Sequence, residues 1–316
     1  MKKIVLILIS SLFCSIKFVA QEVDLPLYVN HLADNPFLIS PTYAGIGTGF
    51  QLRLNGVSQW IGLEDAPVTQ SVSAEVRLAD RFGGGIVIFN DKNGFTSQQG
   101  ARLSLASHLT LSDFYNSFLS FALTYSYTQF GINTSENNTS EAVPNRFLGN
   151  SNFDIGLLYR FERFSISANV INLLDKNIEN FTADEPEVLR KYNIYTTYVF
   201  TRVSRSIELE PSVLVEYRES DSRSRTDLNL KVRKGIRGGY LWAGLSYTFL
   251  NDQIFISNAI SPLFGLKKNK LYLSYGFRLN TNKIQNYNYG SHMITLGFDY
   301  ERRPSLARCT QKMVIF

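Results

Sequence analysis

The sequence predicts an all-β protein, a transmembrane antiparallel β-barrel of about fourteen strands, and three observations support this class. First, residues 271–280 and 294–300 carry an apolar side chain at every second position. Because successive side chains of a strand point to opposite faces, each run has one apolar face and one polar face. Second, similar runs of roughly ten residues recur through most of the chain, as they do in outer-membrane barrels. Third, aromatic residues make up 13% of the chain, which fits aromatic girdles at the two membrane surfaces.

The alternating runs can be laid end to end, and they number about fourteen, an even number as in single-chain bacterial barrels. They are residues 50–56, 71–78, 84–90, 101–111, 118–128, 153–161, 164–171, 192–201, 207–217, 227–233, 240–249, 254–260, 271–280 and 294–300. Pro211 lies on the apolar face of its run. Because proline cannot donate to the ladder, we expect a bulge or a local break there.

The connections between these runs predict an orientation in the outer membrane. If the first run ascends from the periplasm, most connections at the periplasmic end are short, and one of them is expected at residues 261–270. The two longest connections, residues 133–152 and 175–187, then fall at the outer end. Short periplasmic turns and long outer loops are typical of these barrels. We therefore expect both termini in the periplasm.

The N-terminus has the features of a secretory signal peptide in residues 1–20. Lys2 and Lys3 precede an apolar run, and cleavage is expected after Ala20. With Lys17, these lysines account for the fall in formal net charge from +5 to +2 on removal of the segment. The balance that is left implies no nucleic-acid partner.

The rest of the chain divides into three parts. Residues 21–49 are expected to form a periplasmic or lumenal lead-in, residues 50–300 the barrel, and residues 301–316 a C-terminal periplasmic tail. After removal of the signal peptide, Cys309 is the one remaining cysteine, so no intrachain disulfide is expected.

Residues suited to catalysis are few, and we predict that the protein is not an enzyme and takes no cofactor or metal. His31, His108 and His292 lie far apart in the sequence, and none has the spacing of a metal site. His108 shares a polar face with Ser104, but a lumen-lining histidine is the favoured interpretation of that pattern. A working enzyme needs a positioned nucleophile and base, or metal ligands.

The polar faces carry charges of both signs, including Arg53, Glu75, Glu208 and Lys231. This mixture is more typical of a cross-braced, filled lumen than of an ion filter. Alternation alone leaves both an open pore and a plugged barrel possible.

Several short stretches carry motifs of a known family. They are residues 28–45, 59–69, 91–94, 210–212 and 290–294, together with a cysteine near the C-terminus. They resemble the PorP/SprF outer-membrane proteins of the type IX secretion system. The positions that match its motifs are Pro41, Ala44, Gly45, Gln59, Trp60, Pro67, Thr69, Asp91, Gly94, Pro211, Ser212, Gly290, Ser291, His292 and Cys309. Departures from the family pattern are Ser40 in place of Asn, Met293 in place of Glu, and Thr310 in place of Pro.

The resemblance implies a barrel that helps specific cargo, such as a gliding-motility adhesin, leave through the type IX system by recognition or scaffolding. It implies three partners: outer-membrane lipid, the type IX translocon or its periplasmic components, and the C-terminal domain of a secreted cargo protein. The residues themselves leave open an alternative, a passive or hydrophobic-solute channel in which residues 21–49 act as a hatch.

Overall fold

The computed structural model describes residues 29–47, 49–132, 146–175, 188–202, 206–253, 257–281, 283–301 and 307–311. The predicted signal peptide lies outside the described residues. Within the described ranges, no helix has the length and apolarity needed to cross a membrane.

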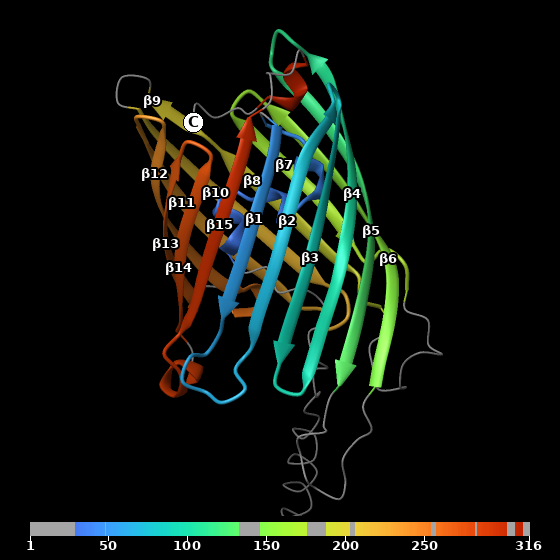
Figure 1. The fold of residues 1–316 in the computed structure, drawn as a ribbon, viewed down its shortest axis with the longest axis vertical. Helices are drawn as coiled ribbons and strands as arrows, with labels where there is room; N and C mark the ends of the chain where they lie inside the picture. Colours follow the sequence, from blue (N-terminus) through green and yellow to red (C-terminus); the bar gives the residue numbers. More distant parts are fainter. Residues whose placement is uncertain are drawn as a thin grey trace, which may run out of the picture.

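The described strands form one closed antiparallel barrel (Figure 1). They are β1 (Gly49–Ser58), β2 (Val68–Ala79), β3 (Phe82–Asn93), β4 (Thr96–Ser112), β5 (Ser117–Ile132), β6 (Arg146–Phe161), β7 (Phe164–Ile171), β8 (Lys191–Tyr198), β9 (Phe200–Arg202), β10 (Ile207–Arg218), β11 (Ser224–Ile236), β12 (Gly239–Leu250), β13 (Ser257–Lys268), β14 (Leu271–Asn280) and β15 (Ser291–Glu301). Neighbours in sequence pair, except that β8 and β9 both pair with β10, and β1 pairs with β15 to close the ring. The short β9 pairs with β10 in the register that β8 begins, so fourteen strands complete the circuit. The predicted fold class is confirmed.

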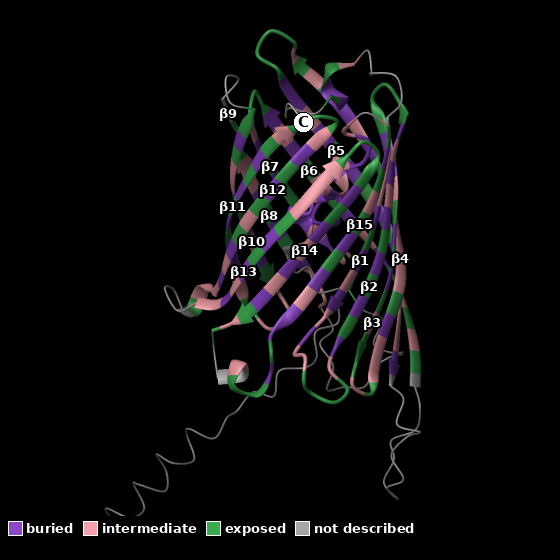
Figure 2. Cartoon of the chain, turned by 60° about the vertical axis from the view of Figure 1, so that its left-hand side comes forward, coloured by how far each residue is buried: buried purple, intermediate pink, exposed green. Residues whose placement is uncertain are grey.

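Buried and exposed residues alternate along the strands of the barrel wall (Figure 2). On β14, Leu271 and Leu273 point outward and are 67% and 51% exposed, whereas Tyr272 and Ser274 point into the lumen and are buried. Arg53 of β1 points inward and is only 1% exposed. Apolar side chains thus cover the outside and polar side chains line the inside. This is the reverse of a soluble protein and suits contact with lipid.

Each predicted run overlaps a described strand, but the run 192–201 covers both β8 and β9, and residues 254–256 lie outside the described residues. Several strands are longer than their alternation indicates. Residues 261–268, predicted to be a connection, belong to β13, and the turn is only residues 269–270. Pro262 interrupts the pattern there, because proline has no N–H to donate and the ladder to β14 lacks pairs at residues 261 and 262. Residues 146–152, predicted to lie in an outer loop, belong to β6, while residues 133–145 are outside the described residues.

The predicted irregularity at Pro211 is confirmed as a local break. The pairing of β10 with β11 is continuous through Pro211, so there is no bulge on that side. On the other side the ladder stops between β8 and β9, opposite Glu210 and Pro211. The backbone N–H of Val199, which lies in this gap, donates instead to the carbonyl of Arg163 at 3.0 Å.

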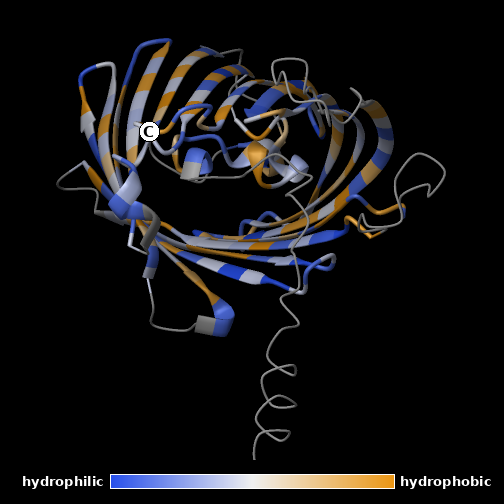
Figure 3. Ribbon diagram, turned by 90° about the horizontal axis from the view of Figure 1, so that it is seen from below, coloured by the Kyte–Doolittle hydropathy of each residue, from blue (hydrophilic) through white to orange (hydrophobic). Residues whose placement is uncertain are grey.

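The lead-in lies inside the ring of strands (Figure 3). It forms three short 3-10 helices, η1 (Val29–Leu32), η2 (Pro36–Leu38) and η3 (Pro41–Tyr43). Pro36 and Pro41 each stand at the start of a helical turn, where the missing N–H is tolerated. The tail turns back as well, and η8 (Arg308–Thr310) buries Cys309 completely. The remaining described helical turns, η6 (Asn251–Gln253) and η7 (Lys283–Tyr287), lie in connections at the end of the barrel opposite the tail.

Candidate functional site

One carboxylate of the lead-in is held by three side chains of the barrel wall. Asp34 accepts hydrogen bonds from Lys231, from Arg233 at 2.8 Å and from the hydroxyl of Tyr240 at 2.6 Å. The Lys231 ammonium also donates to the carbonyl of Leu32 at 2.6 Å. Burial by itself raises the pKa of Asp34, but the charges of Lys231 and Arg233 outweigh it and hold the pKa well below its usual value. We call Asp34, Lys231, Arg233 and Tyr240 the lumenal latch.

The lumenal latch continues into the wall. Arg233 also pairs with Glu210 at 2.5 Å and with Glu208 at 3.6 Å, and both carboxylates belong to β10. The Lys231 ammonium lies 4.3 Å from the centre of the Trp242 ring. Because buried charges are stable only when they are paired, this network fixes the lead-in against three neighbouring strands, β10, β11 and β12.

Apolar contacts hold the lead-in at three further places. Leu32 and Ala33 join a buried cluster with wall residues that include Trp242 and Tyr272. Phe37 and Leu38 join a second cluster on β3–β5, and Ile39 joins a third with Tyr195 and Leu214. Burying one such side chain contributes about 1.5–3 kcal/mol. The lead-in is therefore packed against the wall at three separate places.

Two hydrogen bonds attach the lead-in to distant parts of the wall. The Asn35 amide donates to Ser73 of β2 at 2.8 Å, and Ser40 donates to the side-chain oxygen of Asn169 of β7 at 2.6 Å. These strands lie on different parts of the ring. The lead-in thus bridges the lumen from one wall to another.

The lead-in and the tail meet at His108. Its Nε2 atom donates to the carbonyl of Ala44 at 2.9 Å, so Nδ1 of the neutral ring accepts from Ser120 at 2.8 Å. The Cys309 thiol lies 3.6 Å from the backbone carbonyl oxygen of His108, to which it donates. Ser104 bonds to Thr124 instead, so the structure does not form a Ser104–His108 pair.

A buried arginine receives the tail. Arg160 donates from Nη2 to the carbonyl of Cys309 and from Nη1 to the carbonyl of Gln311 at 3.0 Å. The backbone N–H of Gly47 donates to the carbonyl of Thr310 at 2.9 Å, and this bond joins the lead-in directly to the tail.

The family-motif positions separate into two groups and one isolated pair. Pro41, Ala44, Gly45 and Cys309 form the lumenal group around His108. Gly45 has a φ of +79°, and a Cβ atom there would lie 2.6 Å from the Cα atom of Gly83. No larger residue fits between the lead-in and β3 at this point, which explains the glycine in structural terms.

The second group lies at the far end of the barrel, where the β1–β2 connection is joined to both of its neighbours. Its members are Gln59, Trp60, Pro67, Thr69, Asp91, Gly94, Gly290, Ser291 and His292. The N–H of Ile61 donates to the carbonyl of Gly290 at 3.0 Å, and the N–H of Gly94 donates to the carbonyl of Asp65 at 3.3 Å. Thr69 donates to Asp91 across β2 and β3, and Tyr275 lies 2.6 Å from His292 Nδ1. These positions shape a rim that links three connections.

The isolated pair, Pro211 and Ser212, lies within β10 and belongs to neither group. Pro211 accompanies the strand break, and Ser212 is buried on the lumenal side. The fifteen positions that carry the resemblance therefore do not form a single site.

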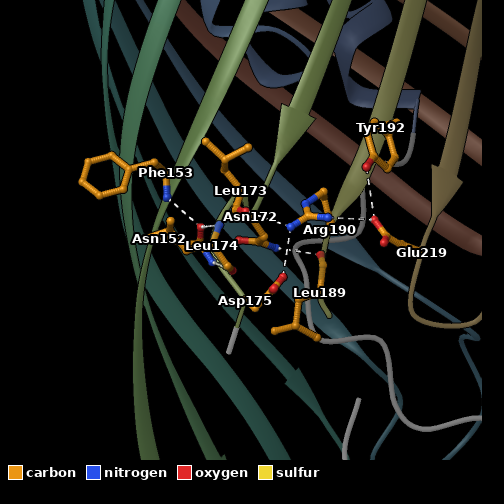
Figure 4. Close-up of polar contacts among 10 residues, drawn as sticks. All are labelled: Asn152, Phe153, Asn172, Leu173, Leu174, Asp175, Leu189, Arg190, Tyr192 and Glu219. Atoms are coloured by element: carbon orange, nitrogen blue, oxygen red, sulfur yellow. Dashed lines mark hydrogen bonds and ion pairs between the residues drawn. The ribbon is translucent and has the colours of Figure 1, made fainter. Parts of the chain in front are cut away.

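The base of the β7–β8 connection is tied to the wall (Figure 4). Arg190 donates to Asp175 at 3.0 Å and to Glu219 at 3.3 Å, and Tyr192 donates to Glu219 at 3.1 Å. On the other side, Asn152 exchanges two hydrogen bonds of 2.8 Å with the backbone of Leu174. The predicted outer loop 175–187 is described only at Asp175, and residues 176–187 lie outside the described residues.

A cavity of about 150 Å³ separates part of the lead-in from the wall. Asp34, Tyr43, Arg160 and Glu210 are among the side chains that line it. Burial raises the pKa of the Tyr43 phenol to about 12, so this hydroxyl is neutral at physiological pH. In the described part of the chain, no group of three or more His, Cys, Asp and Glu side chains is placed to hold a metal ion.

The lumenal latch was not predicted from the sequence, although a signal for it exists. Within residues 29–47, Asp34 is the one acidic residue, and Lys231 and Arg233 stand at successive lumen-facing positions of β11. The single negative charge within residues 29–47 and the two positive charges on the inner face of β11 are complementary, so an ion pair between them could have been proposed. Alternation identifies the faces but does not say which residues meet across the lumen.

A closed antiparallel barrel with an apolar exterior and a polar, occupied lumen is an integral outer-membrane protein. A family model described as "Type IX secretion system membrane protein PorP/SprF" matches residues 20–298. The chain belongs to the PorP/SprF family.

One of three solved structures compared with this chain has a TM-score above 0.5 and shares its fold. The toluene transporter TbuX of Ralstonia pickettii has 9% identity and a TM-score of 0.53, over 84% of this chain and 93% of that one. The toluene transporter TodX of P. putida has 9% identity and a TM-score of 0.47, over 83% of this chain and 92% of that one. For CdiB from Acinetobacter baumannii, 7% identical with a TM-score of 0.38, the alignment covers 80% of this chain but spans only 60% of that protein. A search of curated proteins gave no match to the sequence.

Proposed function

We propose that this protein assists the export of specific cargo through the type IX system by recognition or scaffolding. The observation that supports this most is the seated lead-in, which is held by the lumenal latch, by three apolar clusters and by the junction at His108. A lumen occupied in this way leaves the loops and rims as the surfaces for partners. The family membership supplies the secretion system in which those surfaces act.

We place both termini in the periplasm. The connections on the side of the tail are short, and those described include residues 80–81, 162–163, 237–238 and 269–270. The opposite end carries longer connections, including residues 59–67 and 172–190. Short periplasmic turns and longer outer loops are the asymmetry of outer-membrane barrels. In this orientation the tail end meets periplasmic components. The connections at residues 133–145 and 175–187 meet the translocon or the C-terminal domain of a cargo such as an adhesin.

Loop exchange tests the cargo proposal. Replacing residues 176–187 with a short Gly/Ser linker leaves the Arg190 contacts in place and is expected to reduce export of a specific set of proteins. A matched variant carries the same linker at residues 269–270, on the tail side, and is expected to export normally. Quantitative proteomics of the culture medium and of outer membranes provides the measurement. Unchanged export at normal barrel abundance contradicts the assignment of this loop.

The role we propose includes no chemistry. Analysis of lipid A and phospholipids from a deletion strain tests this, because an outer-membrane enzyme acting on lipid would leave altered species when it is lost. Unaltered lipids together with lost secretion support a scaffold.

A hydrophobic-solute channel is the second candidate, and the cavity beside the lead-in is the observation that favours it. In that role the lead-in would be a hatch. Liposome-swelling and planar-bilayer measurements of the purified protein separate the two candidates. We expect neither conductance nor swelling from the wild-type barrel, and solute-dependent swelling would favour the channel.

A further inference from the structure

A row of amide side chains crosses the outer surface of the barrel on β2–β5. Gln70 stands opposite Asn90, Asn90 opposite Gln99, and Gln99 opposite Gln129 in the strand ladders. Gln70, Asn90 and Gln99 are exposed, and Gln129 is half-buried. Gln99 donates to Gln129 at 3.1 Å. The four side chains form a continuous line of uncharged donors and acceptors on the face that points away from the lumen.

This row lies where the lipid-facing band ends. The next outward-facing row toward the middle of the barrel is Leu54, Val72, Ile88, Ala101 and Tyr127, which pair in that order across β1–β5. Leu54 is 43% exposed, Ile88 52% and Tyr127 46%. The change from apolar side chains to amides thus occurs at one level on four adjacent strands. A tyrosine at such a level is typical of a membrane interface.

The surface is hollowed between these two rows. A groove of about 590 Å³ is lined by both rows, Gln70, Asn90, Gln99 and Gln129 on one side and Leu54, Val72, Ile88 and Tyr127 on the other. Ala101 has the smallest side chain of its row and stands between Ile88 and Tyr127. The groove is formed by the space that its short side chain leaves between these two larger ones. In the described part of the chain, no charged residue is among those that line it. We call it the amide groove.

We propose that the amide groove binds a lipid with an uncharged sugar headgroup. Its apolar side continues the surface that contacts acyl chains, so the ligand is a molecule of the membrane itself. The amides can donate and accept at once, as pairs of sugar hydroxyls do, and Tyr127 offers a ring against which a sugar can lie. A phosphate headgroup would call for arginine, lysine or a cluster of backbone N–H groups, and the groove supplies no cationic side chain. This inference does not depend on the proposed role in secretion.

Native mass spectrometry of the full-length protein tests the proposal. The protein is reconstituted in nanodiscs that contain equal amounts of digalactosyl diacylglycerol and phosphatidylcholine with identical acyl chains. Two or more amide–hydroxyl hydrogen bonds predict a preference for the galactolipid of roughly tenfold. A preference within twofold, or a preference for phosphatidylcholine, overturns the proposal.

Two variants and one matched control locate the site. Ala101→Trp fills the groove, and the double variant Q99L/Q129L removes two amides while keeping side-chain size; each is expected to abolish the preference. Ala243 is an exposed, outward-facing alanine on β12, away from the amide groove, so Ala243→Trp is expected to keep the preference. Retention of the preference in both Ala101→Trp and Q99L/Q129L, or its loss in Ala243→Trp, contradicts a site at the amide groove.

A photocrosslinking amino acid at position 101 distinguishes lipid from a protein occupant. Crosslinks to galactolipid in native-like membranes support the proposal. Crosslinks predominantly to a second polypeptide overturn it and identify the groove as a protein interface.

Discussion

Replacing Asp34 with asparagine tests whether the lumenal latch holds the lead-in. Asparagine keeps the size of the side chain and tolerates the positive φ of 52° at this position, so the backbone is undisturbed. The Asp34 carboxylate is 11% exposed, and its partners Lys231 and Arg233 are 2% and 8% exposed. D34N therefore removes one negative charge from an almost fully buried cluster and leaves both cations in place.

The magnitude follows from what remains around those cations. Removing one partner of a buried ion pair costs about 3–5 kcal/mol. Arg233 still has Glu210 at 2.5 Å, but Lys231 is left mainly with the carbonyl of Leu32 and the Trp242 ring. Because Arg233 keeps a carboxylate partner, we expect the lower value, about 3 kcal/mol. This corresponds to a roughly 150-fold weaker association of the lead-in with the barrel wall.

Hydrogen–deuterium exchange in nanodiscs measures this effect. Peptides that cover residues 29–47 are expected to lose protection in D34N, whereas peptides from β4 and β5 keep theirs. Asp299→Asn is the matched control, because Asp299 pairs at 2.5 Å with Arg53 and at 2.8 Å with Lys267, which both belong to the wall. Wild-type protection of the lead-in in D34N, or equal loss of protection in D299N, would refute the reasoning.

Two further perturbations address the same segment. Because the pKa of Asp34 is depressed in the folded state, its stabilisation of the lead-in is present above its ordinary pKa of about 3.9 and is lost as the pH falls below that value. In a Trp60→Phe background, Trp242 emission is expected to report this acid transition, and D34N is expected to abolish it; an unchanged transition in D34N would assign it to another group. A Cβ atom at Gly83 would clash with a lead-in carbonyl, whereas one at Gly56 meets nothing within 4 Å. Gly83→Ala is therefore expected to raise protease sensitivity of the lead-in while Gly56→Ala does not, and equal sensitivity of the two variants would contradict the close approach.

Alternation predicts the barrel well because membrane contact imposes period two on the outer face of every strand. The run at residues 271–280 has this form, and its strand β14 has the predicted bounds. The signal weakens where the inner face also turns apolar. Val87 and Phe89 of β3 point inward and are buried, although their apolar side chains alone suggest that they face the lipid. Val87 packs in the cluster that holds Phe37, so the exception reflects the lead-in.

Strand ends and contacts across the lumen are harder to predict. In β13, Pro262 and Gly265 interrupt the alternation, and the first residues of β6 mix polar side chains with Phe147 and Leu148, so the local pattern does not distinguish these residues from a loop. The meeting of Asp34 with Lys231 joins residues 197 positions apart, and no periodicity encodes it. The amide groove escaped prediction for a similar reason, since its residues come from ends of runs whose alignment depends on strand register.

The bond between Gly47 and Thr310 has a consequence for the order in which the chain assembles. β1 and β15 are neighbours in the ring but come from opposite ends of the sequence, so their pairing carries the largest chain-closure entropy in the barrel. The segments that flank them meet only when this seam is shut. The contacts between lead-in and tail therefore stabilise the closed ring, and they are absent from an open sheet. A chain shortened before Ala307 keeps every described strand but lacks the tail that contacts the lead-in. We expect its ring to close slowly or incompletely in the membrane.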